Sequence, residues 1–229
     1  MMFRPVVDER VVEFMRYGQK PLTGYLREIQ REAEENGIPI IPRETVAFLR
    51  FLLPHLHIEE ALEIGTAIGF SSSLIAEYGQ CHVTTIDRFD YMIERARRNY
   101  DRYQLNDVIT LLEGQAVDIL PTLPANHYDL MFMDSAKSKY IEFLPQCLRV
   151  VKKGGIIMID DILQAGTVFD PDHTIKHGAR KIHRRLIELL EVVNQVNGLT
   201  STIVPLGDGL LMMTKEAEEI ELPPLRVFH

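Results

Sequence analysis

The sequence lacks a long apolar segment. None of its apolar runs approaches the roughly 20 residues that a membrane-spanning helix needs. The first ten residues, Met1–Arg10, soon reach charged side chains and contain no apolar core of a secretion signal. We therefore expect a soluble, cytoplasmic protein that has no membrane partner.

Cysteine is scarce. Cys81 and Cys147 are the only two, and neither belongs to a CxxC pair. This usage is typical of thiols kept reduced in the cytoplasm, so we expect no disulfide and no zinc site. Internal repeats and long linkers are also lacking. A chain of 229 residues with 46% hydrophobic side chains suits one full-sized domain with appendages.

Basic residues are outnumbered by acidic ones. The formal net charge of −8 argues against a protein that coats nucleic acid by bulk electrostatics. One local exception, the basic segment, runs from His173 to Ile187 without an acidic residue. Such a run suits phosphates but is also common as a solvated helix face, and its histidines (His173, His177 and His183) are expected to be polar surface residues. Its cations are Lys176, Arg180, Lys181, Arg184 and Arg185.

The hydrophobic pattern predicts an α/β fold behind a helical N-terminal region. Apolar residues at helical spacing predict helices within residues 1–56, which form a lid or a dimer surface. In residues 57–229, short apolar runs alternate with helical stretches, which predicts a doubly wound, mostly parallel, Rossmann-like sheet. The five runs are Ala61–Ile64, Val83–Ile86, Val108–Leu112, Tyr128–Met133 and Gly155–Ile159.

The end of the chain breaks this alternation. Thr202–Leu206 and Gly209–Thr214 are separated only by the turn residues Gly207 and Asp208. Two strands joined this closely predict an antiparallel hairpin, which makes seven strands in all. This order is that of class I methyltransferases rather than of nicotinamide dehydrogenases, a likeness at the level of the fold only.

A glycine turn follows the first predicted strand. Its glycines, Gly65 and Gly69, are spaced GxxxG, with Glu63 before them and a serine-rich helix start at Ser71 after them. A dinucleotide fingerprint would need glycine at Ala67. The spacing favours a ligand without pyrophosphate, such as S-adenosylmethionine, although an ordinary tight turn capped by Ser71 would look the same.

The second predicted strand ends at Asp87. An acidic residue at this point can accept hydrogen bonds from two ribose hydroxyls. The alternative is an aspartate that is solvated or caps the next helix. Because the glycine turn precedes it by about twenty residues, as in nucleotide-binding sheets, the two signals reinforce each other.

Three carboxylates follow the fourth and fifth predicted strands. Asp134 comes after Met133, and Asp160 and Asp161 come after Ile159. Since neighbouring parallel strands end at the same edge, we expect these carboxylates to converge and to bind a hard cation, Mg²⁺ or Mn²⁺. Their alternative is to be held by helix N-termini or lysines without a metal.

Most of the chain, from about residue 37 to 215, resembles the metal-dependent O-methyltransferase family that includes catechol and caffeoyl-CoA methyltransferases. The segments ALEIGTAIGFSSS, VTTID, YDLMFMDSAKSKY, VVKKGGIIMIDDIL and PLGDGLLMM carry the resemblance. It implies a seven-stranded class I methyltransferase fold and transfer of the sulfonium methyl group to an oxygen chelated by the metal.

The resemblance also implies roles for individual residues. Glu63, Gly65 and Ser71 match contacts to the methionine end of S-adenosylmethionine, and Asp87 matches the ribose acid. Adenine contacts fall on Gly114, Gln115 and Ala116, and a cofactor-covering position falls on Ile41. Asp134, Asp160 and Asp161 match the metal ligands, and Asp134 also lies near the sulfonium. Lys137 matches the basic lysine that takes the hydroxyl proton or stabilises its loss, provided that its own pKa is lowered; the alternative is a solvated lysine.

Two residues depart from the family pattern. Asp161 stands where the family usually has asparagine, which adds a negative charge and could change the metal preference. Gln115 stands where aspartate is common at the adenine contact. Both side chains keep an acceptor oxygen, so neither change excludes the chemistry.

The acceptor is left with two main alternatives. Within the family, Ile38–Ile40, LEIGTAIG, Pro205–Leu210 and the basic segment resemble bacterial tRNA 5-hydroxyuridine methyltransferases most closely, which implies methylation of the wobble uridine in a tRNA anticodon loop. The chief alternative is a small phenolic acceptor, such as a catechol or a hydroxycinnamoyl thioester. A non-catalytic cofactor- or RNA-binding protein is a third interpretation, which the intact Asp134 and Lys137 count against. The amphipathic N-terminal helices favour a homodimer.

Overall fold

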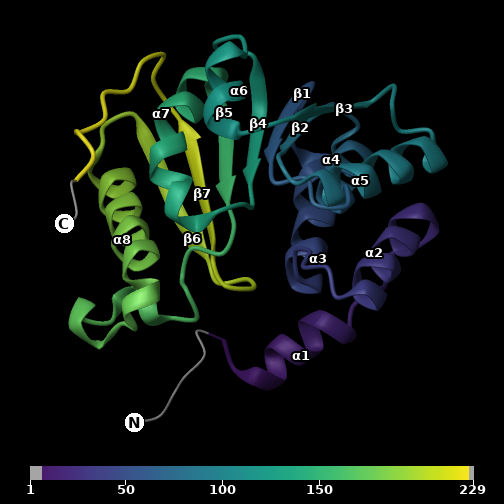
Figure 1. Cartoon of the computed structure of the whole chain (residues 1–229), viewed down its shortest axis with the longest axis horizontal. Coiled ribbons are helices and arrows are strands. Elements are labelled where there is room, and N and C mark those ends of the chain that lie inside the picture. Colours follow the sequence, from purple (N-terminus) through teal and green to yellow (C-terminus); the bar gives the residue numbers. More distant parts are fainter. Residues whose placement is uncertain (1–6, 227–229) are drawn as a thin grey trace. The chain divides into compact units, whose positions relative to one another are not determined.

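The computed structural model describes residues 7–226 and divides into two compact units, with the boundary between Ile119 and Leu120 (Figure 1). Residues 1–6 of the predicted unexported start lie outside the described range. We call the units unit 1 and unit 2 and treat each by itself. The boundary predicted after residue 56 stays a prediction.

Unit 1 holds the N-terminal helices and the first three strands. The predicted helices form, and the third ends in a 3-10 turn, Leu53–His55, that contains Pro54. The elements are α1 (Glu9–Tyr17), α2 (Gly24–Asn36), α3 (Arg43–Leu52), β1 (Glu60–Ile64), α4 (Phe70–Gly79), β2 (His82–Asp87), α5 (Asp90–Tyr103), β3 (Ile109–Glu113) and the single turn α6 (Ala116–Ile119).

The three strands of unit 1 are parallel, in the order β3-β2-β1. β1 and β2 are buried on both faces, as expected for apolar runs covered by helices. Helices α2 and α3 contact α4. Helix α1 differs, because none of its residues is buried and Phe14 and Tyr17 are exposed.

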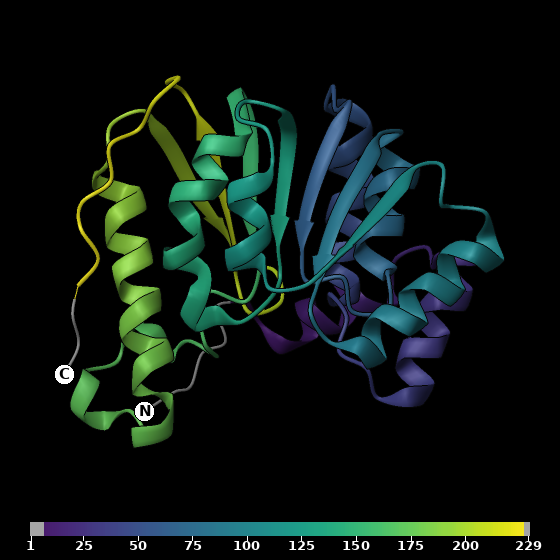
Figure 2. The ribbon, with the colours of Figure 1, turned by 45° about the horizontal axis from the view of Figure 1, so that its top comes forward.

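Unit 2 holds the last four strands and two long helices. Figure 2 shows α7 and α8 side by side in this unit. Between β5 and α8 the chain forms only short 3-10 turns. The elements are β4 (Tyr128–Met133), α7 (Tyr140–Val150), β5 (Val151–Ile159), α8 (Arg180–Gln195), β6 (Leu199–Val204) and β7 (Leu210–Lys215).

In unit 2, β4 and β5 are parallel, whereas β7 pairs antiparallel with both β5 and β6. The β6–β7 hairpin confirms the prediction for the end of the chain. Its Gly209 has φ +88°, and a Cβ at this position would collide with the Leu163 side chain. Glycine is therefore required here for both the backbone angle and the space.

The strand order is β3-β2-β1 in unit 1 and β4-β5-β7-β6 in unit 2. This order confirms the predicted mostly parallel, doubly wound α/β fold with a C-terminal antiparallel hairpin. Both cysteines, Cys81 and Cys147, are buried. Among residues 7–226, no helix is long and apolar enough to cross a membrane.

Candidate active site

The glycine turn of unit 1 links β1 to α4 with left-handed backbone at three positions. Gly65 has φ +107°, Ala67 has φ +47° and Gly69 has φ +83°. Ala67 adopts this region although it carries a Cβ, which costs about 1 kcal/mol or more relative to glycine. Its N–H donates to Asp87 Oδ2 over 2.9 Å, and this bond holds the strained residue in place.

Asp87 is the organising acceptor of this turn. Besides Ala67, its carboxylate accepts hydrogen bonds from the backbone N–H groups of Arg88 (2.7 Å) and Phe89 (3.0 Å), both on Oδ1. Both N–H groups precede α5, whose N-cap is Phe89 without a side-chain cap, so the helix-capping alternative for Asp87 was wrong. Because Oδ2 has one partner among these bonds and two lone pairs, it can still accept from a ribose hydroxyl.

Glu63 lies fully buried beneath the turn. Its Oε2 accepts a hydrogen bond from Thr85 Oγ1 over 2.5 Å, and Thr85 in turn contacts Thr66 Oγ1 over 2.6 Å. Thr66 and Thr85 were not predicted as site residues, because a threonine in or after a strand carries no sequence signal of such a network. Together they fix the backbone where β1 ends.

The serine-rich start of α4 is packed rather than open. Ser72 Oγ contacts Tyr100 Oη over 2.7 Å, and a Cβ at Gly69 would lie 2.6 Å from the Tyr100 ring. Gly69 is the N-cap of α4, so the interpretation of Ser71 as the capping residue was wrong. Ser71 is buried in the first turn; its contact with a cofactor stays a prediction.

The predicted adenine-contacting residues follow β3. Gly114, with φ +141°, donates its N–H to Asp87 O over 2.8 Å, which brings this turn beside Asp87. Gln115 is exposed, with Oε1 3.2 Å from Arg88, and Ala116 begins α6. Ile41 is buried between α2 and α3. The structure thus brings Glu63, Gly65, Asp87 and Gly114 together, while the role of Ile41 stays a prediction.

Unit 2 brings two of the predicted metal ligands to the ends of paired strands. Met133 of β4 is in register with Ile159 of β5, and the Asp160 N–H donates to Met133 O over 2.9 Å. Burial, and then the charge of Asp161, raise the pKa of Asp134 to about 6. Burial, and then the charge of Asp134, raise the pKa of Asp160 to about 7. Both shifts indicate carboxylates that favour an added positive charge.

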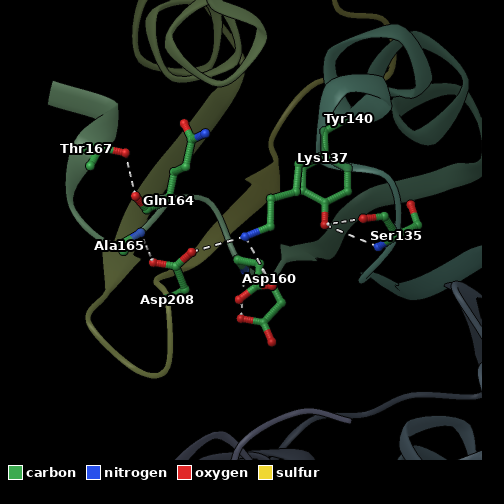
Figure 3. A network of polar contacts seen from close by, with 9 residues as sticks. Ser135, Lys137, Tyr140, Asp160, Gln164, Ala165, Thr167 and Asp208 are labelled. Carbon is green, nitrogen blue, oxygen red and sulfur yellow. Dashed lines mark hydrogen bonds and ion pairs between the residues drawn. The ribbon is translucent and has the colours of Figure 1, made fainter. Parts of the chain in front are cut away.

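Asp161 points instead to Lys137. Its Oδ2 lies 3.2 Å from Lys137 Nζ. Lys137 Nζ also lies 3.1 Å from Asp208 Oδ2 (Figure 3). Burial acts to lower the pKa of Lys137, but Asp161 and Asp208 outweigh it and raise that pKa. Within residues 7–226, no three His, Cys, Asp or Glu side chains are grouped closely enough to hold a metal ion. Convergence of all three aspartates on a metal therefore stays a prediction.

Tyr140 braces the turn between β4 and α7. Its hydroxyl donates to Ser135 O and accepts from the Ser135 N–H, each over 3.2 Å (Figure 3). Burial, followed by the charge of Asp134, raises its pKa well above the usual value, so it remains a neutral phenol. Tyr140 was not predicted as a site residue, because a tyrosine at a helix start is usually a packing residue.

The segment after Asp161 is a left-handed loop tied to the hairpin. Asp161, Gln164 and Ala165 have positive φ angles of +62°, +50° and +55°. The Ala165 N–H donates to Asp208 Oδ1 over 2.6 Å, and the Leu163 N–H donates to Asp208 O over 2.8 Å. Asp208, predicted only as a turn residue, is therefore a structural partner of this loop as well as of Lys137.

The basic segment is only partly open. Lys176 and Lys181 are exposed. Arg180 donates to Ile175 O over 3.0 Å, Arg184 forms two 2.8 Å bonds to Asp172, and Arg185 pairs with Glu188 over 2.7 Å. The five predicted cations thus lie along one stretch of chain, but its arginines already have partners.

One histidine of the basic segment does not lie at the surface. His183 is fully buried, so its prediction as a surface residue was wrong. It shares the inner face of α8 with Leu186 and Leu190, at helical spacing. His173 and His177 are exposed, as predicted.

A family model described as O-methyltransferase matches residues 17–216. The chain belongs to this family. This match confirms the prediction of an O-methyltransferase. It favours that prediction over a nicotinamide oxidoreductase and over a non-catalytic binding protein.

This O-methyltransferase is similar to relatives with two kinds of name. It is 28% identical to a catechol O-methyltransferase of Mycobacterium tuberculosis over 69% of this chain and 70% of the relative. It is 26% identical to a caffeoyl-CoA O-methyltransferase of Populus kitakamiensis over 75% and 76% of the two chains. A solved structure of a Podospora anserina methyltransferase bound to S-adenosylhomocysteine aligns with a TM-score of 0.81 at 20% identity, covering 91% of this chain and 95% of that one. The last likeness confirms the fold.

Proposed function

We propose that this O-methyltransferase takes its methyl group from S-adenosylmethionine and transfers it to a hydroxyl that is chelated, together with a neighbouring oxygen, by a divalent cation. The observation that carries the proposal is the pairing of Asp134 and Asp160 at the ends of β4 and β5, with Lys137 nearby. The methyl donor is supported by the bound product in the Podospora anserina structure and by the glycine turn with Asp87.

The residues of unit 2 fit a hard divalent cation. Asp160 is buried and Asp134 is partly buried. Burial and the charge of Asp161 raise the pKa of Asp134, and burial and the charge of Asp134 raise that of Asp160, so a cation bound by these carboxylates would relieve repulsion. Asp161 would become the third ligand of the cation by turning away from Lys137. When bound, Mg²⁺ or Mn²⁺ would lower the pKa of the acceptor hydroxyl and hold it in place.

Lys137 has a narrower role than the resemblance implied. A lysine that acts as a base needs a lowered pKa, whereas the pKa of Lys137 is raised by its two carboxylate neighbours. Lys137 therefore acts as an ammonium ion, which stabilises the negative charge that develops on the acceptor oxygen. Tyr140 holds the turn that carries Ser135 and so fixes the backbone between Asp134 and Lys137.

For the acceptor we propose 5-hydroxyuridine at the wobble position of tRNA. Its hydroxyl lies beside a carbonyl, which gives the two adjacent oxygens that chelation needs. The exposed Lys176 and Lys181 of the basic segment support contact with phosphates of an anticodon loop. The resemblance of the hairpin turn Pro205–Leu210 to tRNA-modifying members of the family is a further reason for this proposal.

A small phenolic acceptor is the second candidate. It is favoured by the names of the relatives from Mycobacterium tuberculosis and Populus kitakamiensis. A catechol also presents two adjacent oxygens, so the same acidic site would serve it. The two candidates differ in whether the basic segment is needed, because a small phenol makes no phosphate contacts.

The deciding experiment measures methyl transfer from radiolabelled S-adenosylmethionine to two acceptors, tRNA that carries 5-hydroxyuridine and a simple catechol. Each is assayed with Mg²⁺, with Mn²⁺ and with a chelator. We expect metal-dependent labelling of the tRNA. Labelling of the catechol alone would move the acceptor to small phenols, and labelling that survives the chelator would refute the metal site.

A further inference from the structure

Asp208 lies at the turn of the β6–β7 hairpin and joins two parts of unit 2. Its Oδ2 is 3.1 Å from Lys137 Nζ, and its Oδ1 accepts the Ala165 N–H over 2.6 Å (Figure 3). Its backbone oxygen accepts the Leu163 N–H over 2.8 Å. One residue therefore holds both the ammonium of Lys137 and the loop that begins at Asp161.

Lys137 has two carboxylate partners at nearly equal distances. Asp161 Oδ2 lies at 3.2 Å and Asp208 Oδ2 at 3.1 Å from its Nζ. A carboxylate that turns to bind a cation gives up much of its attraction for a neighbouring ammonium. If Asp161 were the only partner, its departure would leave the partly buried ammonium unpaired, which is costly.

We propose that Asp208 is a positioning residue, which stays paired with the Lys137 ammonium when Asp161 turns away from it toward the divalent cation. The inference rests on the proposed metal site. It explains why one lysine faces two acidic side chains. Asp161 has a positive φ and begins the loop that Asp208 anchors through the Ala165 N–H. Through Asp208, the β6–β7 hairpin would thus set how readily Asp161 leaves Lys137 to bind the cation.

The substitution Asp208→Asn separates the two contacts of Asp208. Asparagine keeps an acceptor oxygen for the Ala165 N–H but removes the charge that attracts Lys137. Lys137 then pairs with Asp161 alone and competes with the cation. We expect Mn²⁺ affinity, measured without acceptor by the electron paramagnetic resonance signal of free Mn²⁺, to fall about tenfold.

A matched control removes a similar ion pair at the other end of β4. Asp129 Oδ1 lies 2.6 Å from Lys152 Nζ, and Asp129→Asn should leave Mn²⁺ affinity unchanged. Asp208→Glu, which keeps the charge, should bind Mn²⁺ within about threefold of the wild type. Thermal melts by circular dichroism establish that each variant is folded before binding is measured.

The decisive comparison repeats Asp208→Asn in a Lys137→Gln background. If Asp208 acts through Lys137, Asp208→Asn changes the Mn²⁺ affinity of the Lys137→Gln protein less than about twofold. An equal loss in both backgrounds would show that Asp208 is only a nearby negative charge, and unchanged affinity in folded Asp208→Asn would refute the inference while leaving the metal site intact. A wild-type protein that binds no Mn²⁺ would overturn the metal site and the inference together.

Discussion

At the scale of single residues, the candidate site depends on backbone angles that side chains tolerate poorly. Gly69 combines a positive φ with close approach to the Tyr100 ring, and Ala67 adopts a left-handed angle that Asp87 holds by a hydrogen bond. The sequence showed the glycine spacing. It could not show Ala67, because nothing in an alanine signals a left-handed position.

Gly69→Ala should destabilise the protein more than Gly37→Ala does. Both glycines have positive φ, but a Cβ at Gly37 meets nothing within 4 Å, whereas one at Gly69 lies 2.6 Å from the Tyr100 ring. We expect about 1 kcal/mol for Gly37→Ala and about 3 kcal/mol for Gly69→Ala. Urea denaturation measures the free energy of unfolding of both variants. Equal losses would show that the Tyr100 ring moves aside without destabilising the protein.

Asp134→Ala should abolish methyl transfer and the response to metal. Asp134 is a partly buried carboxylate directly after β4, and burial raises its pKa to about 6. Alanine removes its charge from the proposed cation site. A loss of at least about 1,000-fold in kcat/KM is expected. Asp129→Ala, at the other end of the same strand, should retain activity. A fully active Asp134→Ala variant would contradict the assignment.

At the scale of elements, alternating apolar runs predicted the five parallel strands closely. Val108–Leu112 was predicted where β3 spans Ile109–Glu113, but β5 (Val151–Ile159) begins four residues before the predicted Gly155–Ile159. The closing hairpin was predicted, although β6 (Leu199–Val204) begins three residues before the predicted Thr202–Leu206. The loop from Asp161 to Gly166 was not predicted, because Gln164 and Ala165 adopt left-handed angles without being glycine. Its geometry comes from the contacts to Asp208 and Gly209, which are distant in the sequence.

Strand β7 contains a buried lysine with a measurable pH dependence. Lys215 is 1% exposed and donates from Nζ to Asn126 Oδ1 and to Val151 O, each over 2.9 Å. Burial lowers its pKa below the ordinary 10.5, so the folded state gives up this proton at a lower pH than the unfolded state does. Between the two pKa values the unfolded state binds more protons, and the lysine's contribution to stability rises with pH.

We expect the free energy of unfolding of the wild type to rise relative to Lys215→Met as pH increases toward 10.5. Chemical denaturation of both proteins at several pH values above neutral measures this difference. A difference that is constant with pH would show that Lys215 has its ordinary pKa in the folded state.

At the scale of the whole molecule, an acidic chain with one basic segment must bind RNA locally if it binds RNA at all. Since Arg184 and Arg185 are paired with Asp172 and Glu188, reversing their charge would also disturb structure. The exposed Lys176 and Lys181 offer a cleaner test of the proposed acceptor.

Lys176→Glu with Lys181→Glu should weaken methylation of tRNA about tenfold or more and reduce the salt dependence of binding, while sparing a catechol. Lys153→Glu, an exposed lysine of β5, serves as the control. Equal activity of both variants on tRNA would show that the basic segment is a solvated face.

We also expect a homodimer formed through the N-terminal helices. Phe14 and Tyr17 of α1 are 66% and 68% exposed, an apolar surface that favours burial against a second chain. Light scattering should give twice the chain mass of 26.3 kDa, and Phe14→Glu should shift it toward one. A wild-type mass of one chain would contradict the expectation.

The burial of both thiols makes this protein suited to spectroscopic labelling. Burial raises the pKa of Cys147 above its usual range, and Cys81 is enclosed near Ile75 O, so neither is a ready nucleophile toward a maleimide. A cysteine introduced at an exposed position of the basic segment that is not one of its cations, such as His177, would be the one thiol open to a fluorophore. Dye emission could then report acceptor binding in the native background, without prior removal of the natural cysteines.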